Sequence, residues 1–316
     1  MKYILKIPAG HEKSVFIVSV SGGKDSAALA AEMKRLAEET GIEVRYVFAD
    51  TGWEAPETYE YLATMERVLG ITIDRVGFPG GMLAKIRERA GFPNGGAKWC
   101  TDELKLRPLR AYHDAIAAEC DTDTINVIGV RAEESAKRAK LAEWEYSDEW
   151  RGYVWRPIHA LTIADVLAIH HHAGLPVNPL YKRGHGRVGC YPCFRETKGG
   201  IALIAEHSPE RIDELHALEH ECSEERARRN VETPGRYTIE EATFFQKIVA
   251  AHGKDGARLA NEAGRPKRKG VPFPIREAVA WSRTSRGGVQ LKLIQESPDS
   301  GCFRWGMCEP PEKGGE

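Results

Sequence analysis

The sequence lacks long apolar runs, has few cysteines and carries almost no net charge. Its purely apolar runs are short, such as Val15–Val18, whereas a membrane helix needs roughly 18 such residues. Residues 1–14 contain no apolar stretch resembling a secretory signal, so we expect a cytoplasmic protein without a membrane partner. Seven cysteines in 316 residues are too few and too unevenly spaced for a disulfide framework. Metal or redox chemistry explains them better.

The formal net charge of −1 conceals an uneven distribution. The whole chain gives no argument for a nucleic-acid partner, since 45 Lys+Arg stand against 46 Asp+Glu. Residues 254–292, however, hold ten basic and three acidic side chains, a local charge of +7 that leaves −8 for the remainder. This segment is a candidate contact for a nucleic-acid acceptor, with Trp281 as a stacking ring. The alternative is a solvated basic loop.

Short β-rich runs alternate with helical segments in the first half of the chain. Strands are expected at 15–20, 43–49, 71–76 and 124–130, and helices at 27–39, 56–69, 82–90 and 102–118. This alternation predicts an α/β fold with a parallel, doubly wound sheet, whose ligands bind beyond the carboxyl ends of the strands. We expect residues 1–150 to form this nucleotide-binding domain.

The pattern changes from about residue 151. A helix at 163–172 precedes an irregular Pro/Gly-rich stretch at 174–200, and helical segments follow at 209–222, 224–231 and 239–251. Residues 151–316 are therefore expected to form a mainly helical region that contains cysteines. The run His170–His172 is interpreted as a helix end, since successive helical residues diverge and cannot converge on one metal ion.

A loop of small residues separates the first predicted strand from its helix. Small residues let backbone N–H groups converge on an anion at the positive end of the helix, and hydroxyls and a lysine add donors and charge. The alternative is an ordinary glycine turn with a helix cap. The loop residues are candidates for phosphate binding, and Lys24 and Asp25 are also candidates for catalysis: Ser21, Gly22, Gly23, Lys24, Asp25 and Ser26.

Two further groups follow predicted strands. Asp50 and Thr51 come after the second strand, where Asp50 is expected to bond a ribose or base; helix capping is the alternative. Arg131 and Arg138 come after the strand at 124–130, and arginines at a strand end suit the bidentate binding of phosphate or sulfate. For Arg138 the alternative is a solvated helix face on which it pairs with Glu134.

The cysteines fall into three groups. Cys100 precedes a predicted helix, where the helix dipole favours the thiolate. Cys190 and Cys193 form a Cys-x-x-Cys turn that can present two sulfurs to one metal, and zinc held with Cys302 and Cys308 is one alternative. Cys120 and Cys222 lie in helical patterns and are interpreted as small buried apolar residues.

Three of these segments resemble a known group of enzymes. Residues 21–26 resemble the PP-loop of the adenine nucleotide α-hydrolase superfamily. The Asp-Thr-Gly at 50–52 is similar to a segment of the phosphoadenylyl-sulfate (PAPS) reductase family, and residues 178–193 are similar to the Pro-Leu-Tyr and Cys-x-Pro-Cys segment of the adenylyl-sulfate (APS) reductases. The resemblance implies that the loop binds ATP, with Mg²⁺, or APS or PAPS.

The same resemblance implies a [4Fe–4S] cluster. Cys100, Cys190 and Cys193 match three of its ligands, but Trp99 stands where the family has the first cysteine of an adjacent pair. A cubane with four protein-ligated irons needs four thiolates. Cys302 or Cys308 is expected to supply the missing ligand, or the fourth iron is open.

Three functions are compatible with these motifs. The family's reductases carry a C-terminal Glu-Cys-Gly, which is absent near this C-terminus. ATP-dependent, adenylating sulfur transfer, with a sulfur-donor protein and possibly a nucleic-acid acceptor, is therefore the favoured hypothesis. The alternatives are a sulfite-forming APS or PAPS reductase, with Cys302 or Cys308 as nucleophile and a thioredoxin-type reductant, and a nucleotide- and cluster-binding subunit of a modification complex. A homo-oligomer is compatible with each.

Overall fold

The computed structural model describes residues 5–148, 150–250 and 268–285. By their internal contacts the residues form two compact units. Among the described residues, unit 1 comprises 5–81, 100–148 and 150–191, and unit 2 comprises 82–99, 192–250 and 268–285. This division differs from the boundary expected near residue 150, because a strand that follows residue 150 pairs with the central sheet.

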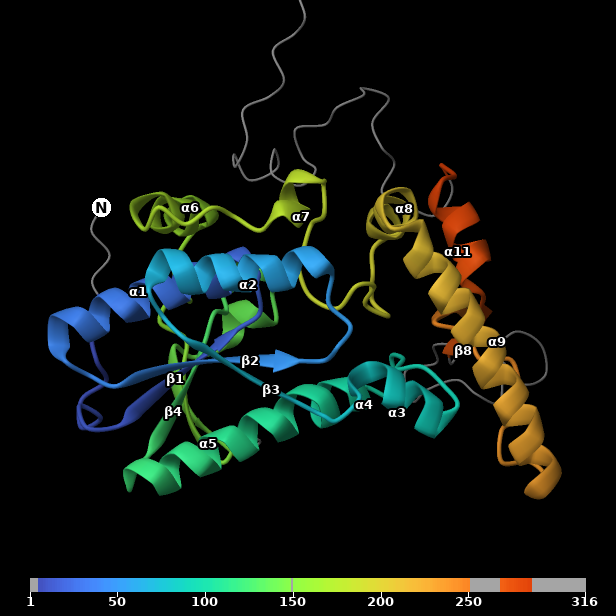
Figure 1. Cartoon of the computed structure of the whole chain (residues 1–316), viewed down its shortest axis with the longest axis horizontal. Helices are drawn as coiled ribbons and strands as arrows, with labels where there is room; N and C mark the ends of the chain where they lie inside the picture. Colours follow the sequence, from blue (N-terminus) through green and yellow to red (C-terminus); the bar gives the residue numbers. More distant parts are fainter. Residues whose placement is uncertain (1–4, 149, 251–267, 286–316) are drawn as a thin grey trace, which may run out of the picture. The chain divides into compact units, whose positions relative to one another are not determined.

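A six-stranded sheet forms the centre of unit 1 (Figure 1). Its strand order is β3-β2-β1-β4-β6-β5, and all neighbouring pairs are parallel except β5 with β6. The predicted α/β fold with a mostly parallel sheet is confirmed. The strands are β1 (Val15–Val20), β2 (Val44–Asp50), β3 (Ile73–Gly77), β4 (Thr124–Ile128), β5 (Trp144–Ser147) and β6 (Gly152–Trp155).

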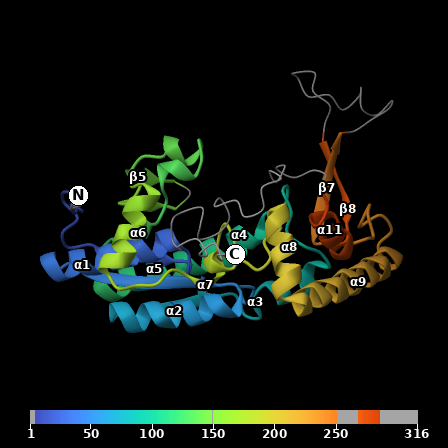
Figure 2. The same cartoon turned by 90° about the horizontal axis from the view of Figure 1, so that it is seen from above.

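Helices cover both faces of this sheet. Figure 1 shows α1 (Lys24–Thr40) and α2 (Pro56–Leu69) over one face and α5 (Arg107–Cys120) over the other. Successive side chains of β1 point to opposite faces of the sheet, which explains this layering. Phe16 and Val18 pack in the core cluster under α1 and α2, while Val15 and Ile17 pack with Leu109 of α5. In Figure 2, α6 (Ile163–His172) lies beside α1.

A π-helical turn interrupts the long helical segment on the second face. The short helix α4 (Trp99–Thr101) continues into the π-helix η1 (Asp102–Leu106) and then into α5. Pro108 lies in the first turn of α5 and has no N–H to donate. An α-helix running straight through Pro108 would lose a hydrogen bond and meet the proline ring at the preceding turn, so the wider turn accommodates it.

Unit 2 is built from helices and one strand pair. Figure 2 shows α11 (Ile275–Ser282) beside the long helix α9 (Pro209–Glu232). The prediction of two helices over residues 209–231 was wrong, since α9 runs through both. The helix predicted at 239–251 was also wrong: β7 (Phe245–Ala250) pairs antiparallel with β8 (Arg268–Phe273). Aromatic and β-branched residues favour the strand once a partner is available. Unit 2 also contains α8 (Lys198–His207) and α3 (Gly81–Arg89) from Met82 onward, and the short helix α7 (Pro179–Lys182) lies in unit 1.

Candidate functional site

The loop at residues 21–23 joins the carboxyl end of β1 to the N-terminus of α1. Gly22 has a φ of +71°, and a Cβ there would lie 2.8 Å from the side chain of Thr58. Gly129, just after β4, is equally constrained, because a Cβ would come within 3.1 Å of the backbone of Asp25. Both positions need glycine to let the loop, α2 and β4 approach one another.

The two serines of the loop bond to each other. The hydroxyl groups of Ser21 and Ser26 lie 3.1 Å apart, and the Ser26 hydroxyl also accepts the Ser21 N–H at 3.1 Å and donates to the carbonyl of Gly23 at 3.0 Å. Ser21 is exposed, whereas Gly22 to Ser26 are buried. The loop therefore presents its polar surface to solvent mainly through Ser21.

Four side chains of alternating charge, Lys24, Asp25, Arg131 and Glu133, form a chain of ion pairs beside the N-terminus of α1. The Asp25 carboxylate accepts a hydrogen bond from Lys24 Nζ at 2.9 Å through one oxygen and from Arg131 Nε at 2.5 Å through the other. Arg131 is itself 4% exposed, and its Nη1 donates to Glu133 at 2.7 Å. Burial lowers the pKa of Arg131, but its ion pairs with Asp25 and Glu133 outweigh this and raise that pKa above its usual value. The cluster places two basic side chains, Lys24 and Arg131, beside the loop.

Residues far along the sequence contact the backbone of residues 22–24. The buried side chain of Asn178 donates to the carbonyl of Gly22 at 3.1 Å, and the hydroxyl of Tyr181 accepts the N–H of Lys24 at 3.2 Å. Tyr181 also places its ring 5.4 Å from Lys24 Nζ. Burial raises the pKa of Tyr181, which therefore remains a neutral phenol. His170, at the end of α6, is buried with Nε2 2.8 Å from the carbonyl oxygen of Lys24.

The roles of these three supporting residues were not predicted. The helix end at residues 170–172 is confirmed, since α6 ends at His172. The buried position of His170 was missed, as was the contact of residues 178–181 with the loop. Asn178 and Tyr181 belong to the 178–193 segment that the resemblance singles out, which was the available signal, whereas nothing local marks His170.

The turn after β2 is held by its own carboxylates. Asp50 accepts from the Gly52 N–H at 2.9 Å and from the Tyr59 hydroxyl at 2.8 Å. The hydroxyl of Thr51 donates to the buried Glu54 at 2.7 Å. These bonds stabilise the turn and do not cap α2, whose N-cap is Ala55, so helix capping does not describe Asp50 and Thr51. The predicted contact of Asp50 with a ribose or base stays a prediction.

Arg138 makes the local pair that its alternative interpretation describes. Its guanidinium pairs with Glu134 four residues earlier, although the two lie in separate 3-10 helices, η2 (Ala132–Glu134) and η3 (Arg138–Lys140), and 45% of its side chain is exposed. Its predicted role in nucleotide binding stays a prediction. The predicted role of Arg131 in phosphate binding also stays a prediction, and its guanidinium is buried and paired with Asp25.

The first half of the Cys-x-x-Cys segment is attached to the turn after β2. Cys190 forms an isolated antiparallel bridge with Glu54, and the Tyr191 N–H donates to the carbonyl of Trp53 at 2.7 Å. Cys190 is partly buried, and Cys100 is buried in α4 directly before the π-helix. The sequence motif at 190–193 thus begins at the same sheet edge as the candidate nucleotide loop.

The described cysteines do not assemble a four-thiolate cluster. Within residues 5–148, 150–250 and 268–285, no group of three or more His, Cys, Asp or Glu side chains is placed to hold a metal ion. Trp99 replaces one family ligand, and Cys302 and Cys308 lie outside the described residues. The described residues alone do not supply four thiolates for a [4Fe–4S] cluster, and the predicted cluster stays a prediction. Cys222, by contrast, is 1% exposed, so its interpretation as a buried residue is confirmed.

The structure bears in part on two other predictions, the basic segment and the absence of a membrane partner. Of the basic segment 254–292, residues 268–285 are described and form β8, α11 and their flanks. Among the described helices, none is long and apolar enough to cross a membrane.

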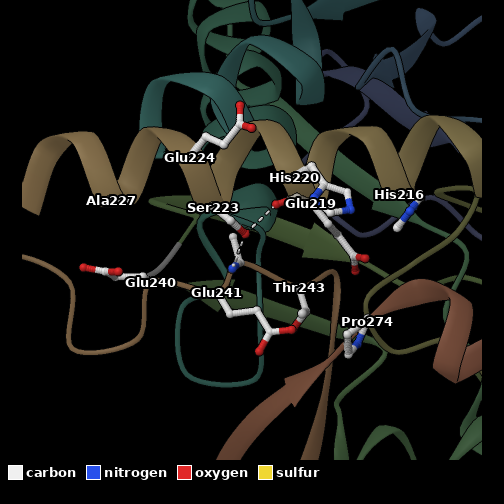
Figure 3. A pocket seen from close by; sticks show the side chains of 11 residues that line it. His216, Glu219, His220, Ser223, Glu224, Ala227, Glu240, Glu241, Thr243 and Pro274 are labelled. Atoms are coloured by element: carbon white, nitrogen blue, oxygen red, sulfur yellow. Dashed lines mark hydrogen bonds between the residues drawn. The ribbon is translucent and has the colours of Figure 1, made fainter.

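Unit 2 contains a pocket of 550 Å³ beside α9 (Figure 3). Glu219 points from α9 toward Thr243 and Pro274 and is 5% exposed. Its carboxylate accepts the N–H groups of Phe244 at 2.8 Å and Ile275 at 2.9 Å. Burial raises the pKa of Glu219 to about 7, although these N–H donors act in the opposite direction. The other lining residues are His216, His220, Ser223, Glu224, Ala227, Glu240, Glu241 and Ala242.

The fold defines a class of protein: an α/β protein with a mostly parallel sheet and a glycine-containing loop where β1 meets α1. A family model described as the phosphoadenosine phosphosulfate reductase domain matches residues 15–196, more than half of the chain. The chain belongs to this family.

The sequence is similar to an uncharacterized phage protein and to proteins named as reductases. The uncharacterized 37.8 kDa protein in the gpa 5′ region of Escherichia phage 186 is 31% identical over 91% of this chain and 94% of its own length. The probable 5′-adenylylsulfate reductase 1 of Oryza sativa subsp. japonica is 28% identical over 89% of this chain and 54% of its length. The adenosine 5′-phosphosulfate reductase of Allochromatium vinosum is 29% identical over 49% and 59%. The chain thus spans little more than half of these two reductases.

Solved structures are similar at a lower level. The PAPS reductase of Candida auris in its phosphate complex has a TM-score of 0.41 at 16% identity, covering 56% of this chain and 81% of that one. The U34-tRNA thiolase of Methanococcus maripaludis with its [4Fe-4S] cluster has a TM-score of 0.39 at 15% identity, covering 72% and 76%.

Proposed function

We propose that this chain binds an adenine nucleotide through its phosphates at residues 21–26 and uses ATP to adenylate an acceptor for sulfur transfer. One observation carries the proposal: the loop lies at the carboxyl end of β1, between β2 on one side and β4 on the other. In such sheets this switch point is where ligands bind. The N-terminus of α1 and the cations Lys24 and Arg131 add positive potential at that point.

The reaction divides into two steps. An acceptor oxygen attacks the α-phosphate of ATP, and pyrophosphate leaves. Sulfide then displaces AMP from the activated acceptor with no change in oxidation state. If a protein persulfide delivers the sulfur, the product is a mixed disulfide, and a dithiol reductant supplies the two electrons that release the thiolated acceptor. In both steps Lys24 and the α1 amides stabilise negative charge on phosphate oxygens.

A second function has support from the named relatives. In an APS or PAPS reductase, a cysteine thiolate attacks the sulfur of the adenylyl sulfate, releasing the nucleotide, and a dithiol then releases sulfite as it is oxidised to a disulfide. Two relatives carry that reductase activity in their names. The nucleophile would be Cys302 or Cys308, neither of which stands in a Glu-Cys-Gly sequence. We therefore favour adenylation.

The cofactor and the partners belong to this proposal as well. A [4Fe–4S] cluster, or zinc as its alternative, rests on the spacing of Cys190 and Cys193 and on the resemblance of the segment. A nucleic acid is the proposed acceptor class because of the charge of residues 254–292. Neither assignment enters the two chemical steps above.

The test separates the functions by product. Anaerobically purified protein is incubated with ATP and candidate acceptors, and separately with APS or PAPS plus a dithiol. Acceptor-dependent pyrophosphate release supports adenylation, and sulfite release supports the reductase. Lys24→Ala should reduce either activity at least about tenfold, the effect of losing one charge-assisted contact. Lys34→Ala, on the solvent side of the same helix, is the matched control. ATP binding without either product would favour a non-enzymatic subunit.

A further inference from the structure

A small polar pocket lies at the end of the sheet opposite the nucleotide loop. It encloses 70 Å³ between the start of β4, helix α5 and the turn that leads into β6. The lining residues are Arg110, His113, Asp114, Thr124, Trp150, Arg151 and Gly152. None of them takes part in the proposed adenylation or reduction.

Only one of the two ring nitrogens of the buried His113 has a hydrogen-bond partner among the described residues. His113 is 4% exposed, and its Nδ1 lies 2.9 Å from the hydroxyl of Thr124. Its Nε2 is buried and has no hydrogen-bond partner among the described residues. Buried polar atoms of this kind are nearly always paired, with protein or with a bound species. The ring stands edge-on to Trp150, with centroids 4.9 Å apart.

The surrounding charges decide what kind of species fits. Burial lowers the pKa of His113 to about 4, so the ring is neutral and carries one proton near neutral pH. If Thr124 donates to Nδ1, that proton is on Nε2 and makes it a donor. Arg110 lies over the ring of Trp150, and Arg151 lines the same pocket. Arg110, which also pairs with Asp102 at 4.0 Å, and Arg151 stand against the exposed carboxylate of Asp114, and the unpartnered His113 Nε2–H adds a donor that suits an anion rather than a metal ion.

We propose that this pocket binds a small tetrahedral oxyanion, phosphate or sulfate, between Arg110, Arg151 and His113 Nε2. A volume of 70 Å³ corresponds to about two water molecules at liquid density, enough for one such anion and too little for a nucleotide. The site is independent of the nucleotide loop, which lies at the other end of the strands. Arg151 has a φ of +57°, so its position in the turn is tightly specified.

The experiment follows the imidazole of His113 by NMR in the full chain. Sodium phosphate and sodium sulfate are titrated in parallel at constant ionic strength, with chloride as the control, and loss of the signal in His113→Gln assigns it. We expect a saturable shift of the His113 signal with phosphate, sulfate or both, and the arm that saturates at lower concentration names the preferred anion. A shift that does not saturate, or that chloride reproduces, overturns the proposal.

Three variants separate this pocket from the nucleotide loop. Arg151→Gly keeps a residue suited to the positive φ while it removes the charge, and should weaken the anion's apparent affinity at least about tenfold. Arg67→Gln, at an exposed position on α2, should leave it unchanged. Lys24→Ala should also leave the His113 response unchanged, even where it abolishes ATP binding. An unchanged response in Arg151→Gly would contradict the assignment.

Discussion

The Asp25 carboxylate accepts a hydrogen bond from Arg131 Nε at 2.5 Å and so joins the first turn of α1 to the segment after β4. The two side chains are 12% and 5% exposed, and the residues are 106 positions apart in the sequence. This pair fixes the N-terminus of α1 against the neighbouring strand. It also makes Arg131 a support for the loop, whether or not the guanidinium reaches a ligand.

Asp25→Asn should therefore destabilise the protein strongly. Removing the carboxylate charge leaves the buried guanidinium of Arg131 without its closest counter-ion, a change that costs about 3–5 kcal/mol in comparable buried pairs. The free energy of unfolding in urea measures this. Glu133→Gln is the matched control, because Glu133 pairs with the same arginine but is 49% exposed. It should cost about 1 kcal/mol or less. Equal effects of the two substitutions would refute the role of Asp25.

Tyr181→Phe tests the support under the loop. The substitution keeps the ring but removes the acceptor for the buried N–H of Lys24, which should lower the free energy of unfolding by about 1–3 kcal/mol. Tyr146→Phe removes a hydroxyl from a residue that is 59% exposed and should have little effect. Chemical denaturation of both variants gives the comparison. Similar stabilities would mean that solvent replaces the lost bond at Lys24.

The sequence predicted the local elements of unit 1 closely. Strand β1, helix α2 and helix α6 have the predicted bounds, because each has an uninterrupted pattern and clear end signals. The contacts of Asn178 and Tyr181 with the loop could not be predicted, since they join segments more than 150 residues apart. Strand β7 was mistaken for a helix because its pairing partner, β8, follows in a segment noted only for its charge. Long-range pairing overrides local propensity.

Cys190→Ala tests the metal prediction. If Cys190 is a ligand, the variant purified without oxygen should lose the iron and acid-labile sulfide that the unaltered chain contains. Cys222→Ala is the matched control, because Cys222 is buried in unit 2 beside the carbonyl of Ile86 and should leave the metal content unchanged. Elemental and sulfide analysis measures both. Colourless protein with stoichiometric zinc would contradict the iron–sulfur assignment and support the zinc alternative.

Glu219 should make the stability of this protein depend on pH. The pKa of Glu219 is about 7 in the folded chain, against a usual value of 4.5, so the folded state binds this proton more tightly than the unfolded state does. The stability that the protonated group contributes is complete below pH 4.5 and is lost as the pH rises through 7. A difference of this size corresponds to a loss of about 3 kcal/mol, as an upper bound.

The comparison of Glu219→Gln with the unaltered chain isolates this effect. The glutamine carbonyl can still accept from Phe244 and Ile275 but has no charge to bury. Relative to the unaltered chain, the variant should therefore gain stability between pH 5 and pH 8, measured by urea unfolding at each pH. Glu224→Gln, an exposed carboxylate lining the same pocket, should change the unfolding free energy by less than about 0.5 kcal/mol. The prediction fails if the difference in unfolding free energy between Glu219→Gln and the unaltered chain stays constant with pH. That result would show that the site tolerates the ionised carboxylate of Glu219, because the N–H groups of Phe244 and Ile275 offset its loss of water.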